Sequence, residues 1–160
     1  MSVDPAALLA PDAIRLDEHA ADKAAAVALC GQVLVDCGAV EPAYVPAMLE
    51  REASVSTYVG EGVAIPHATL AGKGAVLRDA LCFVRFPDGV DWDGDRVGVC
   101  IGIAAAGDGH VEILAELAQI LLDPVRAHAL RNATSAAEVL AMLTPADDLP
   151  EPSPVLEGES

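Results

Sequence analysis

The stretch that most constrains the fold is the apolar run Val97–Ala106, VGVCIGIAAA. A run so uniformly apolar is typical of a central strand that is covered on both faces of a sheet. It ends in a GDG loop, and His110 then opens the helical pattern HVEILAELAQILL. The sequence therefore predicts a strand, a loop and a helix in succession. A helix N-terminus presents free N–H groups that suit a phosphate, although many such loops bind nothing.

A second strand pattern, in GEGVAIPHAT at residues 60–69, ends at a histidine. Pro66 cannot donate to a sheet ladder, so we expect the apolar run Val63–Ile65 to stop there and direct His67 off its end. Strand ends in α/β proteins are common sites of ligand chemistry. A histidine there can be a nucleophile, a proton shuttle or a metal ligand, and the alternative is a loop histidine without a role.

Helical and strand patterns alternate along the chain, which indicates an α/β layered fold. Asp22 is a good N-cap and Gly38 a good C-terminal residue for the first helix. Pro46 should distort the second helix, because it removes a backbone donor. The expected elements are a loose leader at 1–12, strands at 13–16, 63–65, 81–86 and 97–106, a turn at 87–89, and helices at 22–36, 41–53, 110–122, 124–131 and 135–143.

Composition limits the function classes. The chain has 160 residues, enough for one domain with a real core, and this core must be aliphatic because 53% of residues are hydrophobic and only 3% aromatic. The net charge of −16 disfavours nucleic acid and anionic membrane surfaces. No apolar run approaches about 18 residues, and the N-terminus lacks the basic region of a secretory signal. We expect a cytoplasmic protein, or one with a basic partner.

The cysteines form no CxxC pair and stand in apolar segments, so we expect buried, reduced thiols rather than a zinc site or a disulfide framework. They are Cys30, Cys37, Cys82 and Cys100. The acidic loop at 91–95 lacks the glutamate and flanking helices of an EF-hand, which argues against calcium.

His67 and His110 both follow strands, and they can share one cleft if those strands are neighbours. The pair could bind a metal together with a carboxylate such as Glu61, or it could handle a phosphoryl group. In phosphoryl transfer, one imidazole attacks phosphorus, the second donates to the equatorial oxygens, and an arginine such as Arg51 adds a bidentate grip. A metal hydrolase is the remote hypothesis, because no HExxH or similar spacing is present.

Each of these residues also has a simpler interpretation. His110 could only cap its helix, Arg51 could form a surface ion pair, and Glu61 could be a solvated loop residue. His19 and His128 have surroundings typical of surface residues. Trp92 is expected to be a packing residue or an interface anchor.

Residues 40–69, VEPAYVPAMLEREASVSTYVGEGVAIPHAT, resemble the A component (enzyme IIA) of the sugar phosphotransferase system. The similarity is greatest to the mannitol branch of the fructose–mannitol family. It extends to FPDGVDW at 86–92, VCIGIAA at 99–105 and the VEIL that follows His110, so that it covers roughly residues 8–144. It implies an α/β fold with a mixed, mostly parallel central sheet of about five strands, flanked by helices on both faces.

The resemblance also implies an activity. His67 would accept a phosphoryl group from phosphorylated HPr and pass it to a cysteine on the B component of a permease, for uptake of mannitol or a related sugar alcohol. His110 would donate to the phosphoryl oxygens, while Arg51 and Glu61 would line the same cleft. No cofactor is implied, and contact with the membrane would be only indirect, through the permease. The acidic surface would steer HPr through a basic docking face.

A nitrogen-type regulatory enzyme IIA, which uses the same histidine but acts by binding other proteins, is the alternative. Tyr58 before VGEG and the helix at 41–52 favour the transport role. We expect a single enzyme IIA domain of type 2 at residues 1–144, and an acidic, proline-rich, disordered tail at 145–160. The sequence departs from the family at Pro46 and in this tail. We expect no attached B or C component, and therefore a free-standing A subunit or a regulatory relative.

Overall fold

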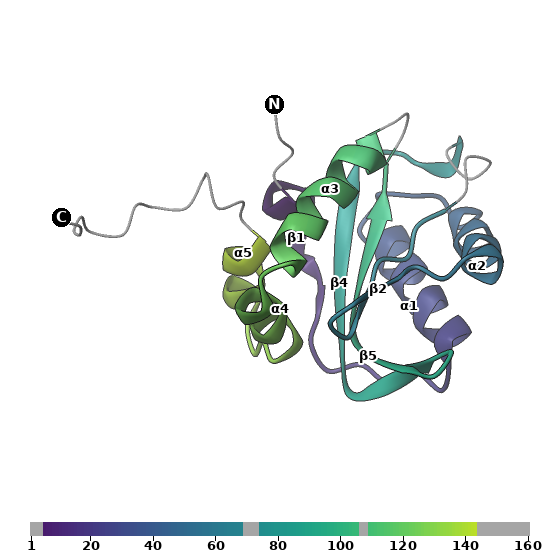
Figure 1. The fold of residues 1–160 in the computed structure, drawn as a ribbon. Coiled ribbons are helices and arrows are strands. Elements are labelled where there is room, and N and C mark those ends of the chain that lie inside the picture. Colours follow the sequence, from purple (N-terminus) through teal and green to yellow (C-terminus); the bar gives the residue numbers. More distant parts are fainter. Residues whose placement is uncertain (1–4, 69–73, 106–108, 144–160) are drawn as a thin grey trace.

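The computed structural model describes residues 5–68, 74–105 and 109–143, which form an α/β fold around one sheet (Figure 1). The strands are β1 (Leu9–Arg15), β2 (Tyr58–Gly60), β3 (Val63–Ala64), β4 (Ala80–Trp92) and β5 (Asp95–Ala104). The helices are the 3-10 helix η1 (Pro5–Leu8), α1 (Lys23–Asp36), α2 (Tyr44–Ser54), α3 (Gly109–Leu121), α4 (Pro124–Arg131) and α5 (Ala136–Leu143). The predicted α/β class with a mixed sheet of five strands is confirmed.

The described strands form a five-stranded mixed sheet in the order β1-β4-β5-β3-β2. β1 pairs with β4, and β3 with β5, in parallel, while the β4–β5 and β2–β3 pairs are antiparallel. β5 holds the central position that its apolar sequence predicts, and its residues from Val99 to Ala104 are buried. The even balance of parallel and antiparallel pairs arises because hairpins join β4 to β5 and β2 to β3.

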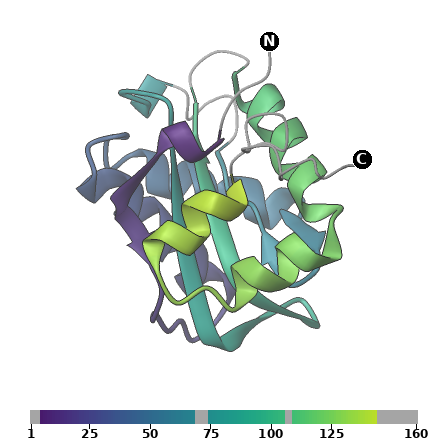
Figure 2. The same cartoon turned by 90° about the vertical axis from the view of Figure 1, so that its left-hand side faces the viewer.

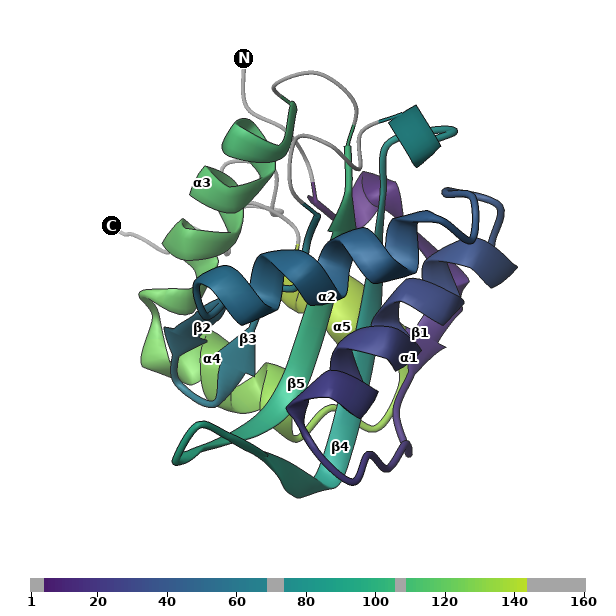
Figure 3. The same cartoon turned by 90° about the vertical axis from the view of Figure 1, so that its right-hand side faces the viewer.

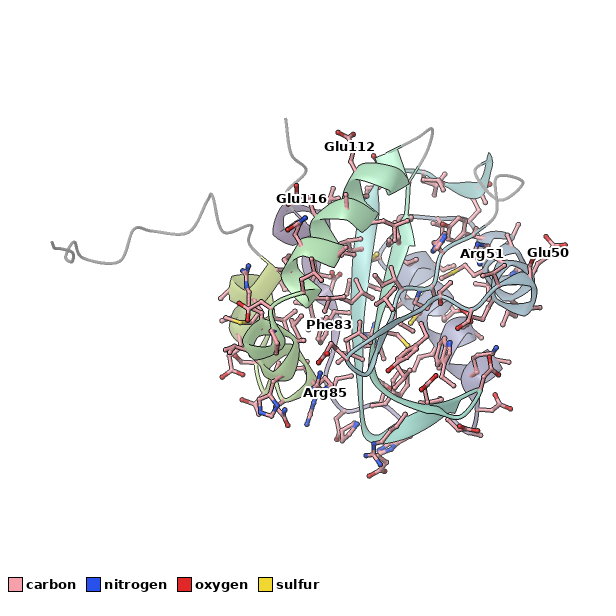
Figure 4. All side chains as sticks on the ribbon, in the orientation of Figure 1. Glu50, Arg51, Phe83, Arg85, Glu112 and Glu116 are labelled. Atoms are coloured by element: carbon pink, nitrogen blue, oxygen red, sulfur yellow. The ribbon has the colours of Figure 1, made fainter. Side chains whose placement is uncertain are left out.

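Helices cover both faces of this sheet, as predicted. α1 and α2 pack against each other on one face, with α1 on β4 and β5 (Figure 3). α3, α4 and α5 cover the other face, where α4 contacts β5 and α5 contacts β1 (Figure 2). Phe83 of β4 is fully buried beneath this second layer (Figure 4). The core is aliphatic apart from a few aromatic side chains, as the composition requires.

The prediction of a loose leader is wrong for residues 5–12. Pro5–Leu8 form η1, and β1 begins at Leu9 instead of Ala13. Pro11 hid this strand, because proline is unusual in a sheet ladder. It is tolerated here since β1 is an edge strand whose register shifts between Leu9 and Ile14.

The predicted turn at Pro87-Asp88-Gly89 is also wrong. β4 continues through these residues to Trp92, with a register shift between Arg85 and Val90. The hairpin turn lies instead at Asp93-Gly94, where both residues have positive φ, 56° and 100°. This is the Asp-Gly pattern that suits a tight hairpin turn. The predicted acidic loop is therefore the tip of the β4–β5 hairpin.

Local capping signals predicted the helices more accurately. The Asp22 side chain accepts a hydrogen bond from Ala25 N (2.8 Å), and Gly38 follows α1 with a φ of 80°. α2 starts later than predicted, at Tyr44. Pro46 then falls in the first helical turn, where a missing N–H breaks no helical bond, and the expected distortion is not needed.

The buried, reduced state predicted for the thiols is confirmed for Cys30, Cys82 and Cys100. Cys37 is also free but only partly buried, because it caps the end of α1. The neighbouring Cys30 side chain, together with burial, raises the pKa of the Cys82 thiol, which donates to Cys30 O (3.4 Å). Among the described residues, no helix is both long enough and apolar enough to cross a membrane.

Candidate functional site

His67 follows β3, and its backbone lies beside the end of β5. β3 and β5 are parallel, so their carboxyl ends meet at one edge of the sheet. The pairing continues past β3, because Ile103 N donates to Pro66 O (2.9 Å). α3 begins just beyond the end of β5 at the same edge (Figure 1). The fold therefore brings His67 and the N-terminus of α3 to one side of the molecule.

A backbone hydrogen bond defines the tautomer of His67. Its Nδ1 lies 2.9 Å from Ile65 O. A carbonyl oxygen can only accept, so Nδ1 must carry the proton, and the lone pair of a neutral ring then resides on Nε2. The ring is half-buried. This is the arrangement that a nitrogen nucleophile needs: one ring nitrogen donates to the backbone, and the other carries the lone pair.

Tyr44 supports the segment that carries His67, a role that the sequence analysis missed. Its hydroxyl donates to Ile103 O (2.7 Å) and accepts from Ala68 N (3.4 Å), so it ties the end of β5 to the residue after His67. Tyr44 is buried, and burial raises the pKa of its hydroxyl to about 12. The hydroxyl therefore stays protonated and keeps both hydrogen bonds at neutral pH.

Arg51 is half-buried on the inner side of α2, while its neighbour Glu50 is exposed on the outer side (Figure 4). Its Nη1 donates to Val55 O (2.6 Å), just beyond the end of its own helix. This bond uses one of five guanidinium donors. The surface ion pair considered as the alternative is not among its described contacts. The predicted contact of Arg51 with a phosphoryl group stays a prediction.

The next residue, Glu52, anchors the end of α2 inside the protein. It is buried, and it accepts from Thr57 N (3.0 Å), from the Thr57 hydroxyl and from Trp92 Nε1 (3.1 Å). Lys23 Nζ lies 3.8 Å from the same carboxylate. These contacts satisfy a charge whose burial would otherwise be costly. Trp92 is thus a packing residue, as predicted, and it also orients this carboxylate.

Glu61 lies at the other end of β3. It occupies the tight turn between β2 and β3 with a φ of 57°, and its carboxylate is 3.7 Å from Arg131 Nη1. Arg131 Nη1 also donates to Glu61 O. The chain from Val63 to His67 spans about 13 Å at the usual rise of an extended strand. The predicted presence of Glu61 in the cleft of His67 stays a prediction, and its described contacts are elsewhere.

The side chain of His110 lies outside the described residues, so its predicted role in the cleft also stays a prediction. Its backbone belongs to the first turn of α3. Within the described ranges, no group of three or more His, Cys, Asp or Glu side chains is arranged to hold a metal ion. His19 and His128 are exposed, as expected for surface residues.

An apolar groove of about 350 Å³ runs beside the edge that carries His67. α3 supplies one wall and the β2–β3 segment the other. Its lining residues are Val59, Ile65, Leu114, Ala118, Leu121 and Leu122. Val59 and Leu122 are 49% and 74% exposed, which is unusual for large apolar side chains. Exposed apolar patches of this kind are common at protein interaction sites.

Fold and site together define a class of protein: an α/β domain that holds an oriented histidine at the edge where two parallel strands end. Residues 7–145 match the family described as "Phosphoenolpyruvate-dependent sugar phosphotransferase system, EIIA 2". Because this match covers most of the chain, the chain belongs to that family of phosphotransferase components.

Named relatives and solved structures agree with this assignment. The chain is 40% identical over 136 residues to the "Mannitol-specific phosphotransferase enzyme IIA component" of Halalkalibacterium halodurans, covering 85% of this chain and 94% of that protein. It is 41% identical over 138 residues to the "PTS system mannitol-specific EIICBA component" of Klebsiella pneumoniae, covering 84% of this chain but only 22% of that longer protein.

Two solved structures share the fold. A complex of enzyme IIA-mannitol and phosphorylated enzyme IIB-mannitol from Escherichia coli has a TM-score of 0.80 at 37% identity, covering 85% of this chain and 98% of the matched chain. The nitrogen regulatory protein IIA-Ntr of Neisseria meningitidis has a TM-score of 0.75 at 29% identity, covering 87% and 98%. The predicted family is confirmed.

Proposed function

We propose that this protein is a phosphocarrier that accepts a phosphoryl group from phosphorylated HPr on Nε2 of His67. It then passes the group to a cysteine of the B component of a sugar permease. In the first step, the bond from phosphorus to the donor breaks as the Nε2–P bond forms. In the second, the Nε2–P bond breaks as a sulfur–phosphorus bond forms with the acceptor thiolate. His110 supplies a hydrogen bond to the phosphoryl oxygens, and Arg51 offers its remaining donors.

The observation that carries this proposal is the hydrogen bond from Nδ1 of His67 to Ile65 O, at 2.9 Å. It assigns the proton to one ring nitrogen and the lone pair to the other, as nucleophilic attack on phosphorus requires. The start of α3 at the same sheet edge supports it further, because helix N-termini favour phosphoryl oxygens.

The neighbouring groove gives the proposal a docking surface. Partners that exchange a phosphoryl group must bring their donor or acceptor atom to His67, so they must cover the protein around it. The exposed apolar wall that includes Val59 and Leu122 suits such a contact. Glu112, exposed on the outer side of α3 (Figure 4), adds negative charge that would attract a basic face on HPr.

The proposed substrate of the permease is mannitol or a related sugar alcohol. The protein itself would act in the cytoplasm. The named relatives at 40% and 41% identity are mannitol components, and one of them contains A, B and C components in one chain. The nitrogen-type regulatory alternative has weaker support, since the neighbour of that type is less similar in sequence and in structure than the mannitol complex.

The decisive experiment is phosphotransfer from phosphorylated HPr to the purified chain, and onward to mannitol-type B components. Wild-type protein should become labelled on a histidine, and His67→Ala should abolish this label. His128→Ala is the matched control, because this exposed histidine on α4 should not affect labelling. Histidine labelling of the His67→Ala variant would overturn the assignment. Labelling without onward transfer to any B component would favour the regulatory alternative.

A further inference from the structure

A charged cavity lies away from His67, at the opposite end of the sheet. A cavity of about 430 Å³ is lined there by side chains from the β2–β3 turn, from β4 and β5, and from the end of α4. Its charged residues are Arg85, Arg96, Arg131 and Glu61. Figure 4 shows Arg85 far down β4 from the edge where α3 begins. This volume is within the range of pockets for small ligands.

The concentration of arginines is unusual for this chain. The protein has nine Lys and Arg residues and a net charge of −16, yet three of those nine cations line this one cavity. Against them stands the single carboxylate of Glu61, which leaves the lining net positive. Like charges gathered without a ligand repel one another, so the arrangement favours an anion between them.

The arginines are held in place by backbone carbonyls, and most of their donors stay available. Arg85 donates to Arg131 O (2.8 Å) and to Leu16 O (3.1 Å). Arg96 donates to Pro87 O (3.4 Å), and Arg131 donates to Glu61 O. A guanidinium has five N–H donors, so these bonds leave each side chain with at least three. The fork geometry of arginine then suits the oxygens of a phosphate.

Two glycines allow the arginines to lie across the backbone. A Cβ on Gly62 would meet Arg131 Cδ at 2.8 Å, and a Cβ on Gly89 would meet Arg96 Nε at 2.6 Å. Both glycines have positive φ, 75° and 76°, which other residues rarely adopt. The bulge in β4 that includes Gly89 therefore leaves room for the Arg96 side chain beside the cavity.

The surroundings restrict the class of ligand. A polyanion such as nucleic acid would be repelled by the strongly acidic remainder of the protein. The oxygens of Glu61 and the amide of Asn132, which also line the cavity, can bond to hydroxyl groups. We infer that this cavity binds a small phosphate monoester that carries hydroxyl groups, with the phosphate on Arg96 and Arg131 and the hydroxyls toward Glu61 and Asn132.

This inference does not rest on the proposed function, because it involves neither His67 nor a transfer step. The test is a calorimetric and NMR titration of the unphosphorylated protein with glycerol 3-phosphate, with inorganic phosphate and with glycerol. We expect the ester to bind most tightly, phosphate more weakly and glycerol not at all. Arg96→Gln and Arg131→Gln should each weaken ester binding about 10-fold, the usual loss for one charge-assisted contact.

Arg78→Gln is the matched control, because Arg78 also donates to a backbone carbonyl, Cys37 O (2.8 Å), but lies outside the cavity. It should leave the affinity unchanged, and so should His67→Ala. Arg96 is exposed, so its variant keeps the test valid if Arg131→Gln impairs folding. Failure of the ester to saturate in the millimolar range would overturn the inference. Equal affinities for phosphate and ester would contradict the proposed contacts between the cavity and the hydroxyl groups of the ester.

Discussion

The two ends of β3 have contrasting chemistry. At the carboxyl end, His67 is held by a backbone carbonyl, the neighbouring Tyr44 makes neutral hydrogen bonds, and an apolar groove lies alongside. At the other end, Glu61 and three arginines surround a polar cavity. A group that must be handed on should be held weakly and oriented well, whereas a ligand that must be retained needs paired charges. The contrast therefore separates a site suited to transfer from one suited to binding.

The comparison also shows how closely spaced residues of one motif can serve different sites. Glu61 and His67 belong to the same ten-residue stretch, GEGVAIPHAT, at residues 60–69. An extended strand rises about 3.3 Å per residue, so a few residues carry the chain across the width of the sheet. Proximity in sequence is thus a poor guide to proximity in space along a strand.

After the loss expected for His67→Ala, the largest expected effect concerns His110. His110→Ala should slow phosphotransfer through His67 about 10²–10³-fold, the usual loss for one transition-state donor, while partners still bind. Single-turnover transfer from phosphorylated HPr measures it, with His128→Ala as the control histidine. Unchanged transfer would mean that His110 only caps α3, and that the carboxyl end relies on other donors.

The second prediction uses the pKa of Tyr44, which burial raises from 10.0 to about 12. The unfolded state releases this proton at lower pH than the folded state, so the stabilisation is complete below pH 10 and is lost as the pH rises toward 12. Two pKa units correspond to about 3 kcal/mol of unfolding free energy as an upper bound. Urea unfolding across this pH window should show the fall in unfolding free energy. In Tyr44→Phe, the unfolding free energy should depend less on pH. If the same pH dependence persisted in Tyr44→Phe, other titrating groups would be its cause.

Tyr44→Phe also tests the support of His67 at neutral pH. Removal of the hydroxyl leaves Ile103 O without its side-chain donor, and the unfolding free energy should fall by about 1–2 kcal/mol. Because the same hydroxyl accepts from Ala68 N, phosphotransfer should also slow in the folded variant. Ester binding at the arginine cavity should not change. A variant that is destabilised yet transfers at the wild-type rate would limit Tyr44 to a structural role.

Local signals predicted much of the fold. The cap at Asp22, the apolar run of β5 and the predicted start of α4 at Pro124 each specify an element within a few residues, and all three are confirmed. The start of β1 and the true hairpin turn were missed, because Pro11 and Pro87 are strand breakers by rule. Both are accommodated here by register shifts that depend on the partner strand β4 or β5.

The site was predictable only in part, for a related reason. The position of His67 after a strand was predictable from the sequence, since Pro66 follows an apolar run. The hydroxyl contact of Tyr44 was not, because its partner Ile103 is distant in sequence. The bond from Trp92 to Glu52 was hidden in the same way. Contacts between distant segments require the register of the sheet, which no local pattern contains.

The smallest expected effect decides which end of β3 Glu61 serves. The resemblance to enzyme IIA predicts that Glu61→Gln impairs phosphotransfer, whereas its 3.7 Å contact with Arg131 predicts a change at the arginine cavity. Removing one partly exposed charge next to Arg131 should tighten inorganic phosphate binding a few-fold, in line with the modest energy of such pairs. Transfer through His67 should stay at the wild-type rate. Both quantities can be measured on one preparation by titration and by single-turnover transfer. Slower transfer with unchanged phosphate affinity would show that Glu61 acts at the histidine site. The two ends of β3 would then not be functionally separate.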